Sequence, residues 1–207
     1  MVRERVNNRD FNDRFIVTVP PGTDPLPLTE LYTASAPLEV DIGCGRGRFL
    51  LARAQANPSL NFLGIDRCTL RLRKIDRRAE VIGLTNIRLI QGDALHLLSR
   101  LPEESAAALY VFFPDPWPKR RHHSRRLVSP HFLDLVFRTL SPAGTIHICT
   151  DHADYYSAIL KLWRSDSRFR DCEPFVPTEA EETDFGLIFR TQNRPANRCS
   201  FSKPPLA

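Results

Sequence analysis

The chain has 207 residues, of which 42% are hydrophobic and 26% charged, the composition of one soluble globular domain with a sizeable core. Its formal net charge of +5 suits an anionic partner without demonstrating one. The five cysteines are scattered without a Cys-x-x-Cys pair, and the longest apolar run, 106–113, is too short for a bilayer. We therefore expect a cytoplasmic protein without a disulfide framework, a metal site or a membrane partner.

Residues 1–36 are polar and rich in proline, and we predict a partly irregular N-terminal arm with one short helix at 28–32. The first residues are polar rather than apolar, so we expect no secretory leader. Residues 37–207 form the second predicted unit, a single domain in which strands and helices alternate. The strands expected there are 38–42, 60–65, 87–90, 106–113 and 144–149. The helices expected between them are 46–56, 69–82, 94–101, 130–140 and 151–164.

This alternation predicts an α/β fold with a Rossmann-like, doubly wound and mostly parallel sheet. In the last helix Tyr156, Ile159, Leu160 and Trp163 recur at helical spacing, and we expect this stripe to face the core. Past residue 171 we expect short strands at 173–176, 187–189 and 198–201. These strands would add an antiparallel C-terminal edge to the sheet.

A glycine-rich turn, Gly43-Cys44-Gly45-Arg46-Gly47, joins the first predicted strand to the first predicted helix. Its spacing is G-x-G-x-G rather than the G-x-G-x-x-G of dinucleotide-binding folds, and Asp41 precedes it by two residues. A carboxylate there would repel a pyrophosphate and attract an ammonium such as that of S-adenosylmethionine. We therefore expect Asp41, Gly43, Gly45 and Gly47 to bind S-adenosylmethionine, and an NAD-dependent oxidoreductase is a distant alternative.

Two more carboxylates follow the next strands. Asp66 ends the second strand, 19 residues after Gly47, where a carboxylate binds ribose hydroxyls. Asp93 follows the third strand, where it can reach the adenine amino group, although capping the next helix is an equally good interpretation. Because the carboxyl ends of parallel strands meet at one edge of the sheet, the three acids together predict a cofactor pocket.

The fourth strand ends in Phe112-Phe113-Pro114-Asp115-Pro116-Trp117. Pro114 and Pro116 fix φ on both sides of Asp115 and favour extended backbone before them, so this acid should be held outward. Trp117 offers a face on which a nucleobase could stack. The cations that follow can bind phosphates; they are Lys119, Arg120, Arg121, Arg125 and Arg126. Each feature alone is more often packing or solvated surface, but together they predict chemistry on a base of a nucleic acid.

From about Leu38 to Phe201 the chain resembles the bacterial tRNA (guanine-N7)-methyltransferases. The motifs that carry the resemblance are 41–47, 62–66, 112–119, Thr150-Asp151 and Thr183-Asp184-Phe185-Gly186. The resemblance implies the class I methyltransferase type of sheet, S-adenosylmethionine as cofactor without a metal, and tRNA as partner of a monomer or homodimer. The implied reaction is methyl transfer to N7 of a guanine, by family resemblance the one in the variable loop.

The resemblance also implies roles for individual residues. Asp115 would line the cofactor pocket beside Asp41, Asp66 and Asp93, and would be the catalytic residue nearest the chemistry. The residues implied to contact the substrate are Lys119, Arg120, Arg121, Asp151, Thr183, Asp184, Phe185 and Gly186. Where the family has an acid at the last position, this chain has Gly186, and Glu182 or Asp184 could supply the carboxylate.

Two alternatives remain open. A similar acidic, proline-containing motif after the fourth strand occurs in enzymes that methylate amino groups of adenine, cytosine or glutamine. Alternatively, the fold could serve a noncatalytic RNA-binding protein. The position of the methyl group in the product distinguishes the first alternative from methylation of guanine N7. Absence of cofactor binding would favour the second alternative.

Overall fold

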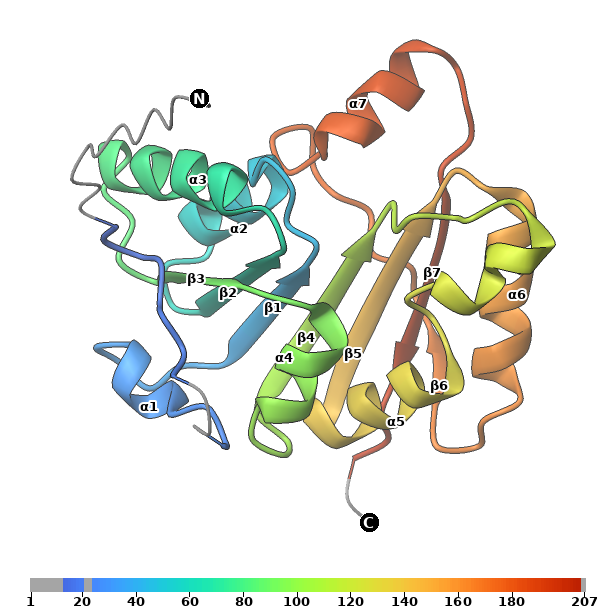
Figure 1. Ribbon diagram of the computed structural model, residues 1–207, viewed down its shortest axis with the longest axis horizontal. Coiled ribbons are helices and arrows are strands. Elements are labelled where there is room, and N and C mark those ends of the chain that lie inside the picture. Colours follow the sequence, from blue (N-terminus) through green and yellow to red (C-terminus); the bar gives the residue numbers. More distant parts are fainter. Residues whose placement is uncertain (1–12, 21–23, 206–207) are drawn as a thin grey trace, which may run out of the picture.

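The computed structural model describes residues 13–20 and 24–205, which form a seven-stranded sheet with the order β3-β2-β1-β4-β5-β7-β6 (Figure 1). Strands β1 to β5 run parallel, and β7 lies antiparallel between β5 and β6. The strands are β1 Leu38–Ile42, β2 Asn61–Asp66, β3 Ile87–Gln91, β4 Ala106–Phe112, β5 Leu140–Thr150, β6 Arg170–Cys172 and β7 Asn197–Ser202. The α-helices are α1 Leu28–Leu31, α2 Arg48–Ala56, α3 Thr69–Val81, α4 Ala94–Arg100, α5 Pro130–Thr139, α6 Ala153–Arg164 and α7 Asp184–Thr191.

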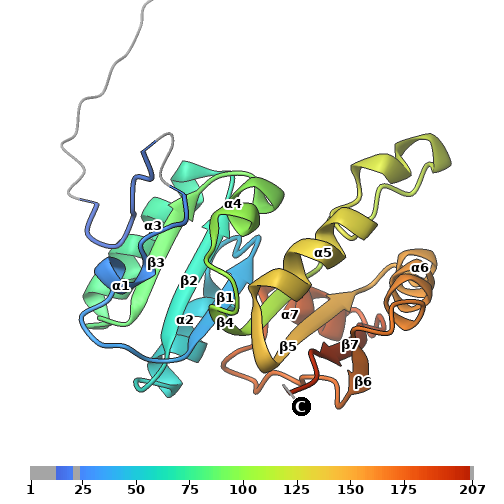
Figure 2. The same cartoon turned by 90° about the horizontal axis from the view of Figure 1, so that it is seen from below.

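Two hydrophobic layers cover the sheet. On one face, alternate residues of β1 such as Val40 pack with α4, α5 and α6. On the other face, α2 and α3 pack over β2 and β3 through residues such as Leu50 and Ile75. Figures 1 and 2 show these helices on opposite sides of the strands. The predicted α/β fold with a mostly parallel sheet and an antiparallel edge is confirmed.

The C-terminal part differs from the sequence-based prediction at two places. Residues 187–189 are not a strand but lie within α7, which Thr183 caps by accepting a hydrogen bond from the Gly186 N–H. A short apolar run does not distinguish a strand from a helix by periodicity alone, which explains this error. The strand expected at 173–176 is also misplaced, since β6 ends at Cys172.

The predicted core stripe of α6 is confirmed at two of its four positions. Ile159 and Trp163 are fully buried, whereas Tyr156 and Leu160 are partly buried and pack against the edge of the core. Tyr155 is buried instead, and its hydroxyl accepts a hydrogen bond from the Val128 N–H. The apolar face of α6 is therefore rotated slightly from the predicted stripe.

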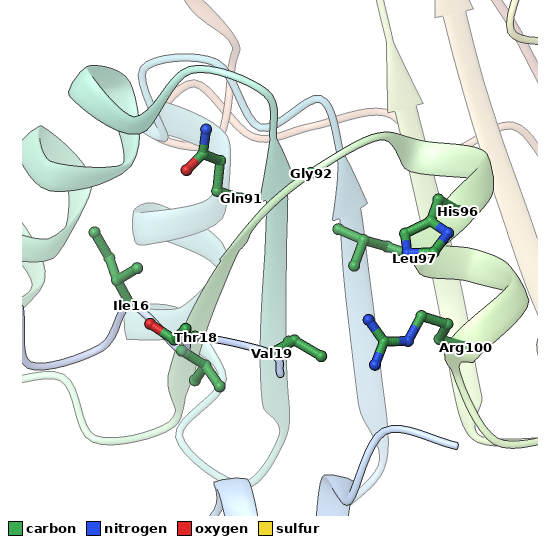
Figure 3. Close-up of a pocket in the computed structure, with 9 residues that line it drawn as sticks. Ile16, Thr18, Val19, Gln91, Gly92, His96, Leu97 and Arg100 are labelled. Carbon is green, nitrogen blue, oxygen red and sulfur yellow. The ribbon is translucent and has the colours of Figure 1, made fainter. Parts of the chain in front are cut away.

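The predicted short helix of the N-terminal arm is confirmed as α1, and a segment before it lies along the sheet. Val17 N–H donates to Leu89 O at 2.8 Å and Leu89 N–H donates to Phe15 O at 2.9 Å, so this segment covers the edge of β3. Between residues 16–19 and α4 lies a cavity of about 270 Å³ (Figure 3). Within the described ranges, no helix has the length and apolar character needed to cross a membrane.

Candidate functional site at the carboxyl edge of the sheet

The glycine turn after β1 adopts left-handed backbone at Gly43, Gly45 and Gly47, with φ of 80°, 56° and 72°. A Cβ at Gly43 or Gly45 would meet nothing closer than 3.8 Å, so both leave room for a ligand. A Cβ at Gly47 would instead lie 2.5 Å from Cγ1 of Ile75. The third glycine is therefore required by the packing of α3 against the start of α2.

Asp41 and Asp66 lie side by side beneath this turn but differ in their partners. The Gly45 N–H donates to Oδ2 of Asp66 at 3.0 Å and the Cys68 N–H donates to Oδ1 at 2.8 Å, so Asp66 fixes the turn. Asp41 is only 4% exposed. Burial, and secondarily the neighbouring Asp66, raise the pKa of Asp41 to about 7. A cation bound beside Asp41 would favour its ionised form.

Asp93 caps α4, because its Oδ1 accepts hydrogen bonds from the N–H groups of Leu95 and His96 at 3.0 and 3.2 Å. Its other oxygen forms an ion pair with Arg67. Burial acts to raise the pKa of Asp93, but the hydrogen bonds from Arg67 and from the helix outweigh burial and lower this pKa. The capping interpretation is thus confirmed, and contact with adenine would require Arg67 to move.

The loop that carries Asp115 departs from the expected backbone. Phe113, directly before Pro114, has a φ of 53° rather than extended geometry, and Trp117 has a φ of 42°. The prediction that Pro114 imposes an extended neighbour is therefore wrong. Left-handed backbone at a residue other than glycine costs of order 1–3 kcal/mol and persists where the surroundings enforce it. Here the Phe113 N–H donates to Cys149 O at 2.7 Å and so continues the β4 ladder beyond the end of the strand.

The carboxylate of Asp115 is exposed and has no hydrogen bond or ion pair with any residue that the structure describes. The loop around it is nevertheless fixed, because Arg126 Nε donates to Pro116 O at 2.8 Å. The Arg126 guanidinium also lies 4.6 Å from the ring centroid of Tyr155. A rigid loop therefore presents an uncompensated negative charge beyond the end of β4.

The basic run after Trp117 forms a 3₁₀ helix, Arg120–Arg125, which sequence reasoning did not predict. The guanidinium of Arg125 lies 5.0 Å from the Trp117 ring centroid, so one face of the indole is already covered. Lys119, Arg120 and Arg121 are exposed. These three cations are available to an anionic partner, whereas Arg126 is used within the protein.

The predicted substrate segment, Thr183–Gly186, lies at the start of α7 and next to the Asp115 loop. The rings of Phe185 and Phe189 lie 6.2 and 5.2 Å from the ring of Phe113. Figure 1 shows α7 beyond the carboxyl ends of β4 and β5. Asp151, at the end of β5, forms an ion pair with Arg194 at 2.7 Å. The fold thus brings the 183–186 segment next to Phe113, which precedes the Asp115 loop, and Asp151 next to Arg194, which follows α7.

Gly186 is buried against Glu182. A Cβ at position 186 would collide with Oε1 of Glu182. Glu182 is 8% exposed and forms an ion pair with Arg198 at 3.5 Å. Glu182, Gly186 and Arg198 line a cavity of about 380 Å³ together with Arg190, Asn193, Arg194, Pro195 and Ala196. Glu182, rather than Asp184, is therefore the carboxylate next to residue 186.

Two arginines of α2 that were not predicted as site residues hold the segment before α7. Arg48 Nε donates to Glu182 O at 2.9 Å, and Arg53 Nη1 donates to Oε1 of the buried Glu181 at 3.2 Å. Arg53 also pairs with Glu39 of β1 at 2.9 Å. Glu39, a charged residue inside the predicted strand 38–42, was the one sequence signal for this network.

Comparisons with known proteins agree with this geometry. A family model described as "Putative methyltransferase" matches residues 35–185. The curated tRNA (guanine-N(7)-)-methyltransferase of Nitrosococcus oceani is 44% identical over 139 residues, 67% of this chain and 59% of that protein. The protein of the same name from Halorhodospira halophila is 41% identical over 154 residues, 72% of this chain and 67% of that protein. The chain therefore spans less than two thirds of the length of the Nitrosococcus protein.

Solved structures match the fold over most of the chain. The 16S rRNA methyltransferase KamB gives a TM-score of 0.66 at 16% identity and covers 86% of this chain and 93% of its own. At this identity the likeness concerns the fold alone, which is that of the class I methyltransferases. The curated relatives and the family model go further, and the chain belongs to the tRNA (guanine-N(7)-)-methyltransferase family.

Proposed function

We propose that the protein transfers the methyl group of S-adenosylmethionine to N7 of a guanine in tRNA. The observation that carries this proposal is the carboxylate of Asp115, which pairs with no residue that the structure describes and which a fixed loop presents near exposed cations and α7. Family membership supports the same reaction. The cytoplasmic location and the monomeric or homodimeric state expected from the sequence remain predictions.

The residues of the carboxyl edge fit S-adenosylmethionine. Gly43 and Gly45 leave open space beside the turn, and Asp41 is a buried carboxyl with a raised pKa that a ligand ammonium would ionise. Asp66 and Asp93 would bind the ribose and the adenine, in the order of the strands that they follow. The bound cofactor supplies an electrophilic methyl group on a sulfonium. The protein's own residues hold and orient the two reactants.

The proposed mechanism requires no general base. Guanine N7 carries a lone pair in the neutral base, so no proton has to leave before the new bond to carbon forms. Catalysis then rests on in-line positioning of the base and on electrostatics. Positive charge develops on the purine as N7 is methylated, and the Asp115 carboxylate is free to stabilise this charge because no residue in the described part of the chain pairs with it.

The substrate side of the site combines charge and shape. Lys119, Arg120 and Arg121 are exposed and would bind phosphates near the target base. Asp151 and the 183–186 segment would contact the target nucleotide, with Glu182 as the carboxylate beside Gly186. Since Asp151 is paired with Arg194, a direct contact from Asp151 to the base would require this pair to open.

Transfer of labelled methyl groups from S-adenosylmethionine tests the proposal. Unmodified tRNA transcript, a DNA oligonucleotide of the same sequence and a mixed protein extract would serve as acceptors, with Asp115→Ala alongside the wild type. We expect label in tRNA alone, and little label with the variant even though it still binds cofactor. Label in protein would favour the amino-methylating alternative. Cofactor-independent tRNA binding without any label would favour a noncatalytic RNA-binding protein.

A further inference from the structure

The positive charge of the chain is concentrated in two segments. Residues 67–81 carry six arginines or lysines and two carboxylates, and residues 119–126 carry five arginines or lysines and no carboxylate. Together the two segments hold a formal charge of +9, whereas the whole chain has +5, so the remaining residues are net negative. The first segment comprises Arg67 and α3, and it has no role in the function proposed above.

The cations of α3 are directed outward because of the helical period. Leu72, Ile75 and Ala79 are fully buried and fix the inner face of the helix. The cations on the exposed side are Arg71, Lys74, Arg77 and Arg78. Three of these, at positions 71, 74 and 78, are spaced by three and four residues and therefore form one stripe.

The two acids of α3 do not neutralise this stripe, because both interact with residues of the N-terminal segment. Asp76 is buried and accepts a hydrogen bond from the Phe15 N–H at 2.6 Å. Glu80 pairs with Arg14 at 3.4 Å. Lys74 has no hydrogen bond or ion pair to any residue in the described part of the chain, and Arg78 only donates to the carbonyl of Arg46. Like charges at this spacing repel one another, so a bound polyanion would relieve an unfavourable interaction.

The stripe begins at the candidate site. Arg67 pairs with Asp93, and Arg71 lies 3.7 Å from Asp66, so the first cations of the segment lie beside the predicted cofactor residues. Figure 1 shows α3 at the upper left and the yellow-green segment after β4 at the right, with the carboxyl ends of β1 and β4 between them. Figure 2 shows the same separation from below. An RNA that places a base near Asp115 can therefore contact both basic surfaces.

We infer that the exposed face of α3, comprising Arg71, Lys74, Arg77 and Arg78, is a second docking surface for the tRNA backbone. This inference rests on the proposed function, because it requires RNA to cross the carboxyl edge of the sheet. The contacts are with phosphates and carry no sequence information. The surface sets affinity and the orientation of the tRNA rather than the chemistry.

Binding of fluorescent tRNA transcript at a series of salt concentrations tests this surface. In the double variant Lys74→Gln/Arg78→Gln, two lost phosphate contacts should reduce the slope of log K against log salt by about 1.4 to 1.8. The matched control is Lys161→Gln, an exposed lysine in the last turn of α6, at the end away from the candidate site. At saturating tRNA the double variant should keep the wild-type turnover, while its KM for tRNA rises.

The outcomes separate this inference from the proposed function. In one outcome the wild type methylates tRNA and the double variant has the same slope as the Lys161→Gln control. This result would overturn the inference about the α3 surface and leave the proposed function standing. A wild type that binds tRNA without methylating it, with the slope reduced only in the double variant, would overturn the function and support the surface. If the double variant loses helical circular dichroism, the single variant Lys74→Gln is measured in its place. This variant should reduce the slope by about half as much.

Discussion

Gly47→Ala should destabilise the protein more than Gly83→Ala, although both glycines have nearly the same left-handed φ. Their φ angles are 72° and 73°. A side chain in left-handed backbone costs roughly 1–2 kcal/mol at either position. At Gly83 an added Cβ meets no atom within 4 Å, so this strain should be the whole cost.

At Gly47 the added carbon also collides with a buried side chain. The new Cβ would lie 2.5, 2.7 and 3.0 Å from three carbons of Ile75, which is 0% exposed, so the buried side chain would have to shift. Overpacking of this kind costs about 1–3 kcal/mol, which adds to the backbone strain. We therefore expect a loss of about 2–5 kcal/mol at Gly47 and about 1–2 kcal/mol at Gly83.

Urea denaturation of both variants measures the difference, and Ile75→Ala identifies its source. If the collision is the cause, Gly47→Ala combined with Ile75→Ala should lose less free energy of unfolding than the sum of the two single changes. Gly83→Ala with Ile75→Ala should be additive. Equal losses at the two glycines, or additivity in both pairs, would refute the assignment of Gly47 to helix packing.

Three further predictions concern ionised groups. The pKa of Asp41 in the folded protein, about 7, lies above the usual 3.8, so without cofactor the folded state binds the extra proton between these values. The free energy of unfolding should therefore contain a contribution that falls as pH rises from about 4 to 7, and urea titrations of Asp41→Asn should lack it. Asp115→Asn should reduce single-turnover methylation by about 10²–10³-fold with cofactor affinity largely kept in calorimetry, and a loss of cofactor affinity alone would contradict its catalytic role. Arg53→Met leaves the buried carboxylates of Glu39 and Glu181 unpaired and should cost about 3–5 kcal/mol in urea denaturation, where a cost below about 1 kcal/mol would mean that the pair is replaceable.

Much of the fold could be predicted from the sequence because its signals are local. The parallel strands are mostly apolar, and the glycine turn and the acids Asp41, Asp66 and Asp93 lie at or near the carboxyl ends of β1, β2 and β3. Alternation of strands and helices then limits the sheet to a doubly wound arrangement. The positions of Asp41, Asp66 and Asp93 at one edge follow from this topology alone.

The remaining features depend on contacts between distant residues. The segment 187–189, predicted as a strand, lies in a helix that Thr183 caps locally and that Phe189 holds against Phe113, a contact that no local pattern specifies. The left-handed backbone of Phe113 likewise depends on a hydrogen bond to Cys149. The pairing of Glu182 with Arg198, more distant in sequence, was equally unpredictable from local patterns.

The position of the methyl group in the tRNA product distinguishes guanine-N7 methylation from methylation of any other atom. After incubation with S-adenosylmethionine, the tRNA would be treated with borohydride and aniline, which cleave the strand at 7-methylguanine. We expect one cleavage site, present with the wild type and absent with Asp115→Ala. Methyl label in the RNA without any cleavage would place the group on another atom and contradict the guanine-N7 mechanism.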